Sequence, residues 1–400
     1  MHITHVCPRF KEIHGGGEPV VLHLLEELEA LGIGNTLCTY NFPEPMQFLL
    51  NKNVKLTELP GFFNQSFKNP LLAGLFDLAA TFFYTLLIPR KTNLVCFHME
   101  GVVPALFLYT LFKRRKPTIY FCFQPPRFAY DTTSETIKAG GALGAFVPLL
   151  KSIYKPIDKA AVRRADTVAT FSNGYRDWIH NIYHIDDINI IPPGVKIPDL
   201  IPSLPAEIKS KLSHPGALSL VCVGKLLTWK NIDRLIRITG ILKNKFPGIR
   251  LLVVGDGPCM DSLVAQVKND GLENIVIFCG YQAEENVFSF YKASDLLVLL
   301  EHNASFGLAL VEANTMGIPV MAFEGGGPSD IIVEGENGFL LKNNASDYQI
   351  AELISNYLSD EKKKDKMRMH ALDAAGRYTW ANFARLFKNM AQRVSGRKKS

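Results

Sequence analysis

A single carboxylate and a run of glycines lie close together in the second half of the chain, in an order that suggests a ligand site. Glu312 stands among apolar residues on a helix expected after the turn Phe306-Gly307, and the next strand ends in Gly325–Gly327. Both groups follow apolar runs typical of parallel strands, so they meet at the carboxyl edge of one sheet, where open α/β proteins bind ligands. A carboxylate accepts hydrogen bonds, and glycine lets the backbone approach a ligand closely.

Two lysines five residues apart form a second group that could bind a ligand. Lys225 and Lys230 come directly after an apolar run that ends at Gly224. Lysine is usually a solvated surface residue, but two lysines placed straight after a buried strand are not typical of a surface. Their fixed positive charge suits an anionic group of a ligand.

Strands alternate with helices in both halves of the chain, and this alternation must position those groups. The first series opens with a strand at 1–7, a glycine loop at 14–18 and a helix at 20–31; the second opens with a strand at 218–224. Alternating strands and helices predict parallel sheets covered on both faces, which is an α/β fold of two doubly wound, Rossmann-like domains facing across a cleft. Further strands are expected at 35–39, 94–97, 118–123, 167–171, 250–255, 276–279, 295–300 and 319–323, and closing helices over 347–394.

The length of 400 residues predicts two domains, because single cores rarely grow so large. A proline-rich stretch from 191 to 205 is typical of a linker. We expect an N-terminal domain at 1–195, a linker at 196–205, a C-terminal domain at 206–375, and a final helix at 376–400 that crosses back to the first domain.

Charge and composition exclude several classes of protein. An apolar content of 47% and a charged content of 20% are typical of a folded globular protein. The net charge of +6 does not indicate a nucleic-acid binder, since the basic residues are not interleaved with aromatics on one face. Basic clusters at 113–116, 163–164 and 397–399 are read as solvated surface, with attraction to anionic lipid, about 1 kcal/mol per residue, as the alternative.

The cysteines and one apolar segment bear on location. Seven cysteines are scattered without a C-x-x-C pair, which favours reduced core thiols in a cytoplasmic protein over disulfides or a metal site. The start of the chain reads as a strand and lacks a signal-peptide pattern. The apolar run 71–88 is broken by Asp77, so a buried or interfacial helix, preceded by Phe62, Phe63 and Phe67, is favoured over a spanning one. We therefore expect a cytoplasmic protein, with peripheral contact to the inner face of the cytoplasmic membrane left open.

Short motifs spread over most of the chain occur in an order that is specific although each motif is weak alone. By these motifs the chain resembles the retaining glycosyltransferases of family 4, which have the GT-B fold. The run 124–131, followed by 164–166, is similar to the branch that contains O-antigen mannosyltransferases. The motifs are Gly15–Glu18, Ser172-Asn173, Ile191–Val195, Val223–Leu226 with Lys230, Val254–Pro258, Gly280-Tyr281, Ala293–Asp295, Phe306-Gly307, Glu312-Ala313, Gly317–Val320, Gly325-Gly326 and Asn337–Phe339.

The resemblance implies transfer of a hexose, mannose or a similar sugar, from a nucleotide-diphosphate sugar with retention at the anomeric carbon. It implies that the domain at 1–195 binds the acceptor and that the domain at 206–375 binds the nucleotide sugar. The donor is expected to be GDP- or UDP-linked, and the acceptor to be a glycan or a lipid-linked glycan in the synthesis of cell-surface polysaccharide or glycolipid. The chain has no Asp-x-Asp motif, so positive charge and backbone amides, with no metal and no cofactor, are expected to hold the diphosphate. No protein nucleophile is evident in this fold, and the leaving phosphate is one candidate for taking the acceptor's proton.

The resemblance also assigns roles to single residues. It places His98 near the transferred sugar, Lys230 on the phosphates and Glu312 on the ribose hydroxyls, with Glu100 a weaker candidate beside the sugar. These roles compete with ordinary ones, a structural histidine and a solvated helix carboxylate among them. Substrate contacts are further expected from the phosphate-facing glycines Gly15, Gly16 and Gly17, from Arg127 on an acceptor or donor phosphate, from Lys225, from Tyr281 beside the base, and from Ala304, Ser305, Phe306, Gly307 and Leu308 around the diphosphate.

Two positions depart from the family pattern. The family's Glu-x7-Glu signature ends at Glu312, but its first position is Ala304, and Glu301 would reach the site only if the loop bent differently. Phe123 stands where the related branch often has histidine. These changes leave three possibilities: an altered donor preference, a slow enzyme, or a catalytically impaired subunit that binds nucleotide sugar or glycan. The intact phosphate-binding residues favour an active enzyme over the impaired subunit and over other GT-B enzymes such as an epimerase or a phosphorylase.

Overall fold

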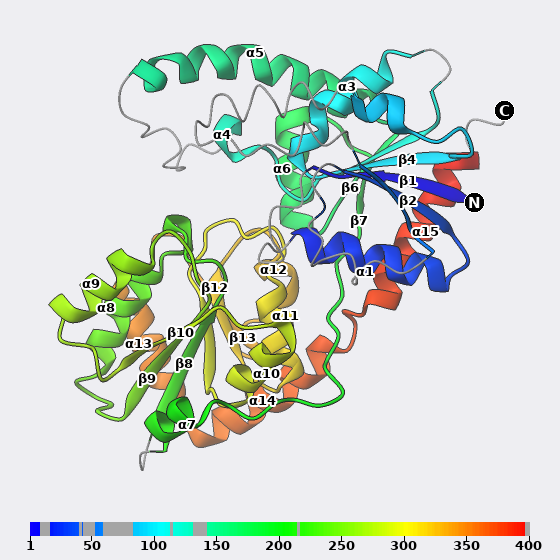
Figure 1. Cartoon of the computed structure of the whole chain (residues 1–400). Helices are drawn as coiled ribbons and strands as arrows, with labels where there is room; N and C mark the ends of the chain where they lie inside the picture. Colours follow the sequence, from blue (N-terminus) through cyan, green and yellow to red (C-terminus); the bar gives the residue numbers. More distant parts are fainter. Residues whose placement is uncertain are drawn as a thin grey trace. The chain divides into compact units, whose positions relative to one another are not determined.

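The computed structural model describes residues 1–8, 17–39, 42, 53–58, 83–112, 115–130, 142–213 and 217–396. The chain divides into two compact units. We call Met1–Pro193 with Trp380–Ser400 the N-terminal unit, and Gly194–Thr379 the C-terminal unit. Figure 1 shows each unit as a twisted sheet with helices packed against its faces.

A seven-stranded parallel sheet, in the order β3-β2-β1-β4-β5-β6-β7, forms the centre of the N-terminal unit. The order reverses between β1 and β4, whose register pairs His5 with Cys96 and Val6 with Phe97. β4 and β5 are buried at every position, as expected for central strands covered on both faces. The strands are β1 (His2–Val6), β2 (Gly34–Thr39), β3 (Lys55–Glu58), β4 (Leu94–His98), β5 (Thr118–Phe121), β6 (Thr167–Thr170) and β7 (Ile188–Ile190).

Helices between these strands cover the N-terminal sheet. Helix α6 shows how local sequence sets a boundary, because the Ser172 side chain accepts a hydrogen bond from the Tyr175 amide and caps the helix. The helices are α1 (Gly17–Ala30), α3 (Val103–Thr110), α4 (Arg127–Tyr130), α5 (Ala142–Arg164), α6 (Asn173–Tyr183) and α15 (Trp380–Gly396), with a 3-10 turn η3 (Glu100–Val102).

The last helix, α15, belongs to the N-terminal unit although it follows the whole C-terminal unit in sequence. The Trp380 ring stacks on His23 of α1 at 4.4 Å between centroids, and Phe383 packs against Phe121 of β5 at 6.0 Å. The connecting segments run together, since the Val195 amide donates to the Tyr378 carbonyl at 3.0 Å. The division between the units therefore falls after Pro193 and again after Thr379.

The C-terminal unit is built on a six-stranded parallel sheet in the order β10-β9-β8-β11-β12-β13. Its strand order reverses between β8 and β11, where Leu220 and Val221 pair with Leu296 and Leu297. Both sheets confirm the predicted α/β architecture. The strands are β8 (Leu218–Val223), β9 (Ile249–Val254), β10 (Val276–Gly280), β11 (Leu296–Leu299), β12 (Val320–Phe323) and β13 (Gly338–Leu341).

Amphipathic helices pack on this second sheet and enclose one continuous apolar core. Helix α13 begins with a capping box in which Ser346 and Gln349 satisfy each other's backbone amides. The helices are α7 (Ala206–Leu212), α8 (Ile232–Leu242), α9 (Met260–Asn269), α10 (Glu284–Lys292), α11 (Leu308–Thr315), α12 (Pro328–Ile331), α13 (Asp347–Leu358) and α14 (Glu361–Ala375), with a 3-10 turn η5 (Thr228–Lys230).

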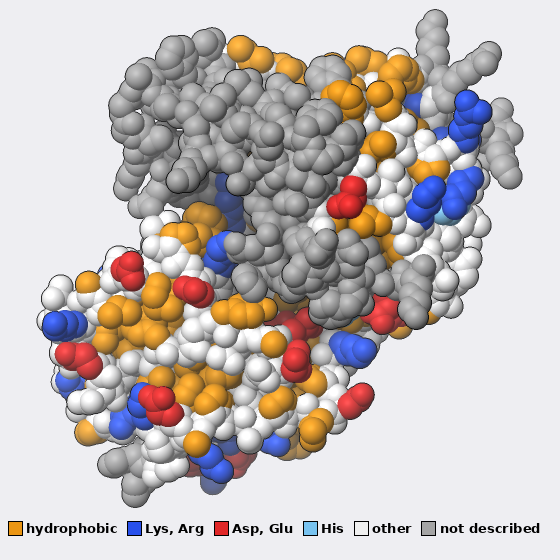
Figure 2. All heavy atoms as spheres, in the orientation of Figure 1, with side chains coloured by type: hydrophobic (Ala, Val, Ile, Leu, Met, Phe, Trp, Pro, Cys, Tyr) orange, Lys and Arg blue, Asp and Glu red, His pale blue; other side chains and the backbone are white. Residues whose placement is uncertain are grey.

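The expected interfacial helix can be compared with the structure only in part. Most of the apolar run 71–88, and Phe62, Phe63 and Phe67 before it, lie outside the described residues. Among the helices that are described, none is long and apolar enough to cross a membrane. On the face shown in Figure 2, acidic and basic side chains of the C-terminal unit are interspersed over a mixed surface.

Candidate functional site

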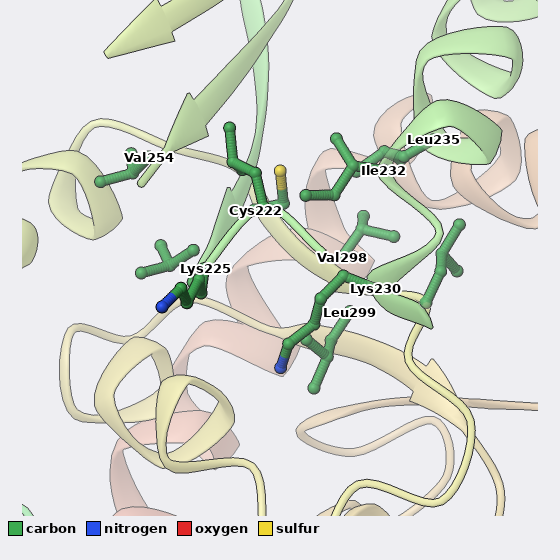
Figure 3. Close-up of a pocket in the computed structure, with 12 residues that line it drawn as sticks. Cys222, Lys225, Lys230, Ile232, Leu235, Val254, Val298 and Leu299 are labelled. Atoms are coloured by element: carbon green, nitrogen blue, oxygen red, sulfur yellow. The ribbon is translucent and has the colours of Figure 1, made fainter. Parts of the chain in front are cut away.

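A pocket opens at the carboxyl ends of β8 and β11, where the strand order of the C-terminal sheet reverses. The empty space at this place, open solvent included, measures about 320 Å³. Figure 3 shows Lys225 and Lys230 extending to the same side, away from Ile232 and Leu235. The site thus joins an aliphatic wall to two cations at the place where α/β sheets bind ligands. The remaining lining residues are Cys222, Val223, Gly224, Leu226, Val254, Val298, Leu299 and Leu300.

Lys230 is held by a carboxylate at the end of β11. Its ammonium donates to Glu301 Oε2 at 2.5 Å, and the Glu301 side chain is only 9% exposed. The neighbouring Asn231, in a left-handed conformation with φ 54°, donates from Nδ2 to the Leu300 carbonyl at 2.7 Å. These two contacts fix η5 against the end of β11, so the ammonium stays at the pocket.

Glu301 ends the segment after β11, and its side chain contacts Lys230. The loop that follows turns at Asn303, which has φ 53°. Ala304 contributes through its backbone instead, since its side chain is 3% exposed and its carbonyl accepts from the Gly327 amide at 3.0 Å. The carboxylate of this loop that contacts a pocket lysine is therefore Glu301.

Close backbone contacts shape the two sides of the pocket. Gly255, after β9, has φ 136°, and a Cβ there would overlap the Gly224 carbonyl oxygen. Gly327, after β12, packs so tightly that a Cβ would overlap the Phe306 carbonyl. The glycines therefore let the loops after β8, β9, β11 and β12 approach one another, which positions Lys225 and the segment 304–308.

Gly327→Ala is expected to lower the free energy of unfolding by about 3 kcal/mol, because the new methyl group forces backbone apart in a packed region. The loop 303–308 should shift with it and weaken ligand binding. Thermal unfolding and nucleotide binding measure the two effects. Gly376→Ala is the matched control, since its Cβ would meet only the Asp373 carbonyl oxygen at 3.8 Å. Equal melting temperatures for the two variants would contradict the close packing of the turn.

Glu312 lies on α11 and faces the fully buried Tyr291 of α10. The Tyr291 hydroxyl donates to Glu312 Oε2 at 2.6 Å. Burial raises the pKa of Glu312 to about 7, against the opposing effect of the Tyr291 hydrogen bond. Near neutral pH the group is thus split between a form that only accepts hydrogen bonds and one that also donates.

The segment before Glu312 takes the expected place at a helix start. Gly307 has φ 93° and caps α11, which begins at Leu308. Phe306 is 3% exposed and packs edge-on against Tyr378 at 5.4 Å between centroids, while Ser305 beside it is partly buried. The first turn of a helix favours negative charge, so the segment suits an anion. Tyr281 follows β10 and is 47% exposed.

In the N-terminal unit, His98 ends β4 at the reversal of strand order and is the last of a chain of hydrogen bonds. The Asn35 Nδ2 donates to the Ile33 carbonyl at 2.9 Å, which turns Asn35 Oδ1 towards His5 Nε2 at 3.2 Å. His5 Nδ1 in turn lies 2.9 Å from His98 Nε2. Because Asn35 Oδ1 can only accept, His5 carries its proton on Nε2 and accepts from His98 Nε2–H.

This chain leaves His98 Nδ1 as an unprotonated nitrogen. The side chain is fully buried, and Nδ1 has no hydrogen-bond partner among the described residues. Burial lowers the pKa of His98 well below its ordinary value, and His5 beside it adds to the effect. His98 is therefore neutral, with one acceptor atom left unused at the end of β4.

His5, Cys96 and His98 are also close enough for a metal to be considered. One ligand atom from each lies within 4.8 Å of the others. However, the hydrogen bond between His5 and His98 uses the two nitrogens that would face an ion, and burial raises the pKa of the Cys96 thiol well above its ordinary value. A thiol that stays protonated is a poor ligand, so these residues fit a hydrogen-bonded core better than a metal centre.

The other predicted residues of the N-terminal unit lie near β4 and β5. Glu100 accepts from Gln124 Nε2 at 3.0 Å, and Arg127 Nε donates to Gln124 Oε1 at 3.2 Å. Burial raises the pKa of Glu100. Gly17 starts α1, and a Cβ there would come within 2.8 Å of the Met99 methyl carbon. The predicted Gly15 and Gly16 lie outside the described residues.

Sequence reasoning missed several residues that complete these clusters. Glu301 was set aside, although it directly follows a strand that ends at the pocket. His5 and Asn35 gave no local signal, since only the pairing of β2, β1 and β4 brings them to His98. Tyr291 gave no local signal either, since the carboxylate that its hydroxyl meets, Glu312, lies 21 residues away in sequence.

Family models cover most of the chain. The model described as Glycosyltransferase Family 4 matches residues 14–197, and the model described as Glycosyl transferases group 1 matches residues 205–373. Among curated proteins, the D-inositol 3-phosphate glycosyltransferase of Nocardia farcinica is 30% identical over 209 residues, covering 50% of this chain and 46% of the relative. The same enzyme from Actinosynnema mirum is 29% identical over 237 residues, 56% of each chain. The match thus spans about half the length of these relatives.

Solved structures of glycosyltransferases share the whole architecture. Sucrose-phosphate synthase from Thermosynechococcus elongatus superposes with a TM-score of 0.80 at 17% identity, covering 100% of both chains. HepE from Anabaena, solved with UDP and glucose, gives a TM-score of 0.71 at 18% identity over 98% of this chain and 100% of the other. Identity this low supports the fold alone, and that fold is GT-B.

Proposed function

We propose that this chain, which matches the models of glycosyltransferase family 4 and of glycosyl transferases group 1 and has the GT-B fold, transfers a hexose from a nucleoside diphosphate sugar with retention at the anomeric carbon. Mannose or a similar sugar is the proposed donor group, carried on GDP or UDP. The proposed acceptor is a glycan or a lipid-linked glycan in the synthesis of cell-surface polysaccharide or glycolipid. We further propose that transfer needs neither a metal ion nor a cofactor.

One observation carries the proposal: the pocket at the ends of β8 and β11 presents two lysines on one side. A nucleoside diphosphate sugar carries its charge on the diphosphate, and lysines at a pocket edge supply fixed compensation for it. The N-terminus of α11 adds favourable backbone charge nearby. HepE, which shares the fold, binds UDP and glucose, and this supports a nucleotide sugar as the ligand.

The proposed roles follow from the chemistry of each group. Lys225 and Lys230 stabilise the negative charge that grows on the departing diphosphate as the bond from the anomeric carbon to the phosphate oxygen breaks. Glu312, ionised or protonated, binds the ribose hydroxyls through Oε1, while the Tyr291 hydroxyl donates to Oε2. Tyr281, exposed after β10, lies beside the base.

The acceptor's hydroxyl oxygen then forms the new bond on the face from which the phosphate leaves. The leaving phosphate oxygen takes the proton of that hydroxyl, so no side chain has to act as nucleophile. His98 Nδ1, an acceptor without a partner among the described residues, binds a hydroxyl of the sugar. Arg127 binds a phosphate of the acceptor or the donor. The curated relatives act on D-inositol 3-phosphate by name, so a phosphorylated polyol is a further acceptor to test.

A donor and acceptor screen tests this function. The full chain is incubated with UDP-glucose, UDP-N-acetylglucosamine or GDP-mannose, and with a membrane extract or inositol 3-phosphate, in buffer with and without EDTA. We expect one donor to be consumed with release of its nucleoside diphosphate, equally in both buffers. Proton NMR of the product should show the donor's anomeric configuration. An inverted product, or activity lost in EDTA, would contradict the proposed mechanism.

Ala304 favours a second candidate, a protein that binds nucleotide sugars without transferring them. Its methyl group supplies none of the interactions of a carboxylate beside the sugar. Tight binding of a donor with no release of its diphosphate, whichever acceptor is present, would support this alternative.

A further inference from the structure

If the proposed function holds, the ammonium of Lys230 interacts with two negatively charged groups. One is built into the protein: Glu301 Oε2 lies 2.5 Å from Lys230 Nζ. The other is the diphosphate of the ligand. The side chain of Lys230 is 23% exposed and that of Glu301 9%, so the lysine can face a ligand while its protein partner remains behind it.

Glu301 has little freedom to leave when a ligand arrives. Its backbone directly follows Leu300, whose carbonyl is fixed by Asn231, and the side chain is largely enclosed. A carboxylate in such a place is screened weakly by water, so its charge acts on any anion bound next to Lys230. A carboxylate therefore lies directly behind one of the two lysines of the pocket.

The donor and the product of a transfer reaction differ in charge. In the sugar-linked donor each phosphate carries one negative charge. In the free nucleoside diphosphate the terminal phosphate has a second ionisation with a pKa of about 6, and hence one more charge at pH 8. A fixed carboxylate repels the product more than the donor.

We propose that Glu301 is a specificity-determining residue that holds Lys230 in position and disfavours the more highly charged nucleoside diphosphate relative to the sugar-linked donor. This rests on the proposed function, because it needs the diphosphate beside Lys230. The proposal also bears on the departure from the family signature. Ala304 stands where the family has its first glutamate, and Glu301, three residues earlier, contacts Lys230.

The size of the effect follows from Coulomb's law. One additional charge several ångströms from a carboxylate, in a pocket partly open to solvent, changes affinity by about three- to tenfold. Glu301→Gln keeps the shape and removes the charge. We expect this variant to bind the nucleoside diphosphate more tightly relative to the donor. The dissociation constant of the nucleoside diphosphate divided by that of the donor should fall about three- to tenfold at pH 8.

Isothermal titration calorimetry of the full chain measures this ratio with UDP and UDP-glucose, or with GDP and GDP-mannose if the wild type binds those. Glu207→Gln is the matched control, because Glu207 forms an exposed pair with Lys211 on α7 and should leave the ratio unchanged. Glu301→Asp keeps the charge and should resemble the wild type. If Glu301→Gln does not fold, Glu301→Ser replaces it.

The outcomes separate this proposal from the function on which it rests. If the wild type binds neither pair of ligands, or if Lys230→Ala binds them as the wild type does, the proposed site is wrong and the role of Glu301 falls with it. If Lys230→Ala weakens binding but neutralising Glu301 leaves the ratio within twofold of the wild type, the role of Glu301 alone is overturned.

Discussion

Lys230→Ala should weaken binding of the nucleoside diphosphate sugar about 100-fold, as measured by titration calorimetry. Removing one side of a hydrogen-bonded charge pair costs about 2–5 kcal/mol, and here the lost ammonium serves both the ligand and Glu301. The variant should also melt at a lower temperature than the wild type. The second effect arises because Glu301, only 9% exposed, is left without the ammonium that compensates its charge.

A double variant separates the two consequences of losing Lys230. Lys230→Ala with Glu301→Gln removes the uncompensated charge, so it should recover much of the lost stability while binding stays weak. Lys211→Ala, which breaks the exposed pair with Glu207, serves as the control and should change neither property. Binding by Lys230→Ala that equals wild-type binding would show that the diphosphate lies elsewhere.

Acidification from pH 7 to pH 4 should lower the free energy of unfolding by about 3 kcal/mol through His5 alone. Burial lowers the pKa of His5 to about 4, from an ordinary value of 6.5. Between these pH values His5 is protonated in the unfolded chain but not in the folded chain. The contribution of neutral His5 to the free energy of unfolding is therefore fully present above pH 6.5 and is lost as the pH falls. His98, whose pKa is also lowered by burial, should add to the loss.

Thermal unfolding measured at steps between pH 7 and pH 4 tests this expectation. His5→Gln removes one of the two titrating groups, so its melting temperature should depend less steeply on pH than that of the wild type. His184→Asn is the control, since His184 is exposed and has φ 53°, a conformation that asparagine tolerates. An unchanged slope for His5→Gln would show that the histidine pair does not titrate as a buried group.

The parallel strands and the two lysines of the pocket could be predicted from the sequence because their signals are local. The run before Gly224 is continuously apolar, as a central parallel strand must be, and Lys225 and Lys230 follow it directly. The weak strands were missed for the same reason: β3, with the pattern Lys-Leu-Thr-Glu, is a half-exposed edge strand with little apolar content. β7 has only three residues.

The partners within the site depend on geometry that no local pattern contains. Glu301 meets Lys230 across 71 positions of sequence, because the end of β11 and the turn η5 lie together in the folded sheet. Which nitrogen of His98 carries the proton depends on an amide of β2, two strands away across β1. The O-antigen branch and the identity of the sugar stay predictions, because the choice of sugar depends on contacts with a ligand.

The return of α15 to the N-terminal unit has a consequence for synthesis on the ribosome. Trp380, Phe383, Phe387 and Met390 are buried there at 6% exposure or less, and Phe387 packs against His5 of the first strand at 5.9 Å between ring centroids. A domain made of one continuous segment of chain can usually fold while it is being synthesised. This one lacks part of its core until the C-terminal unit has been translated, so the nascent N-terminal unit must wait, with apolar surface uncovered, for nearly the whole length of the chain.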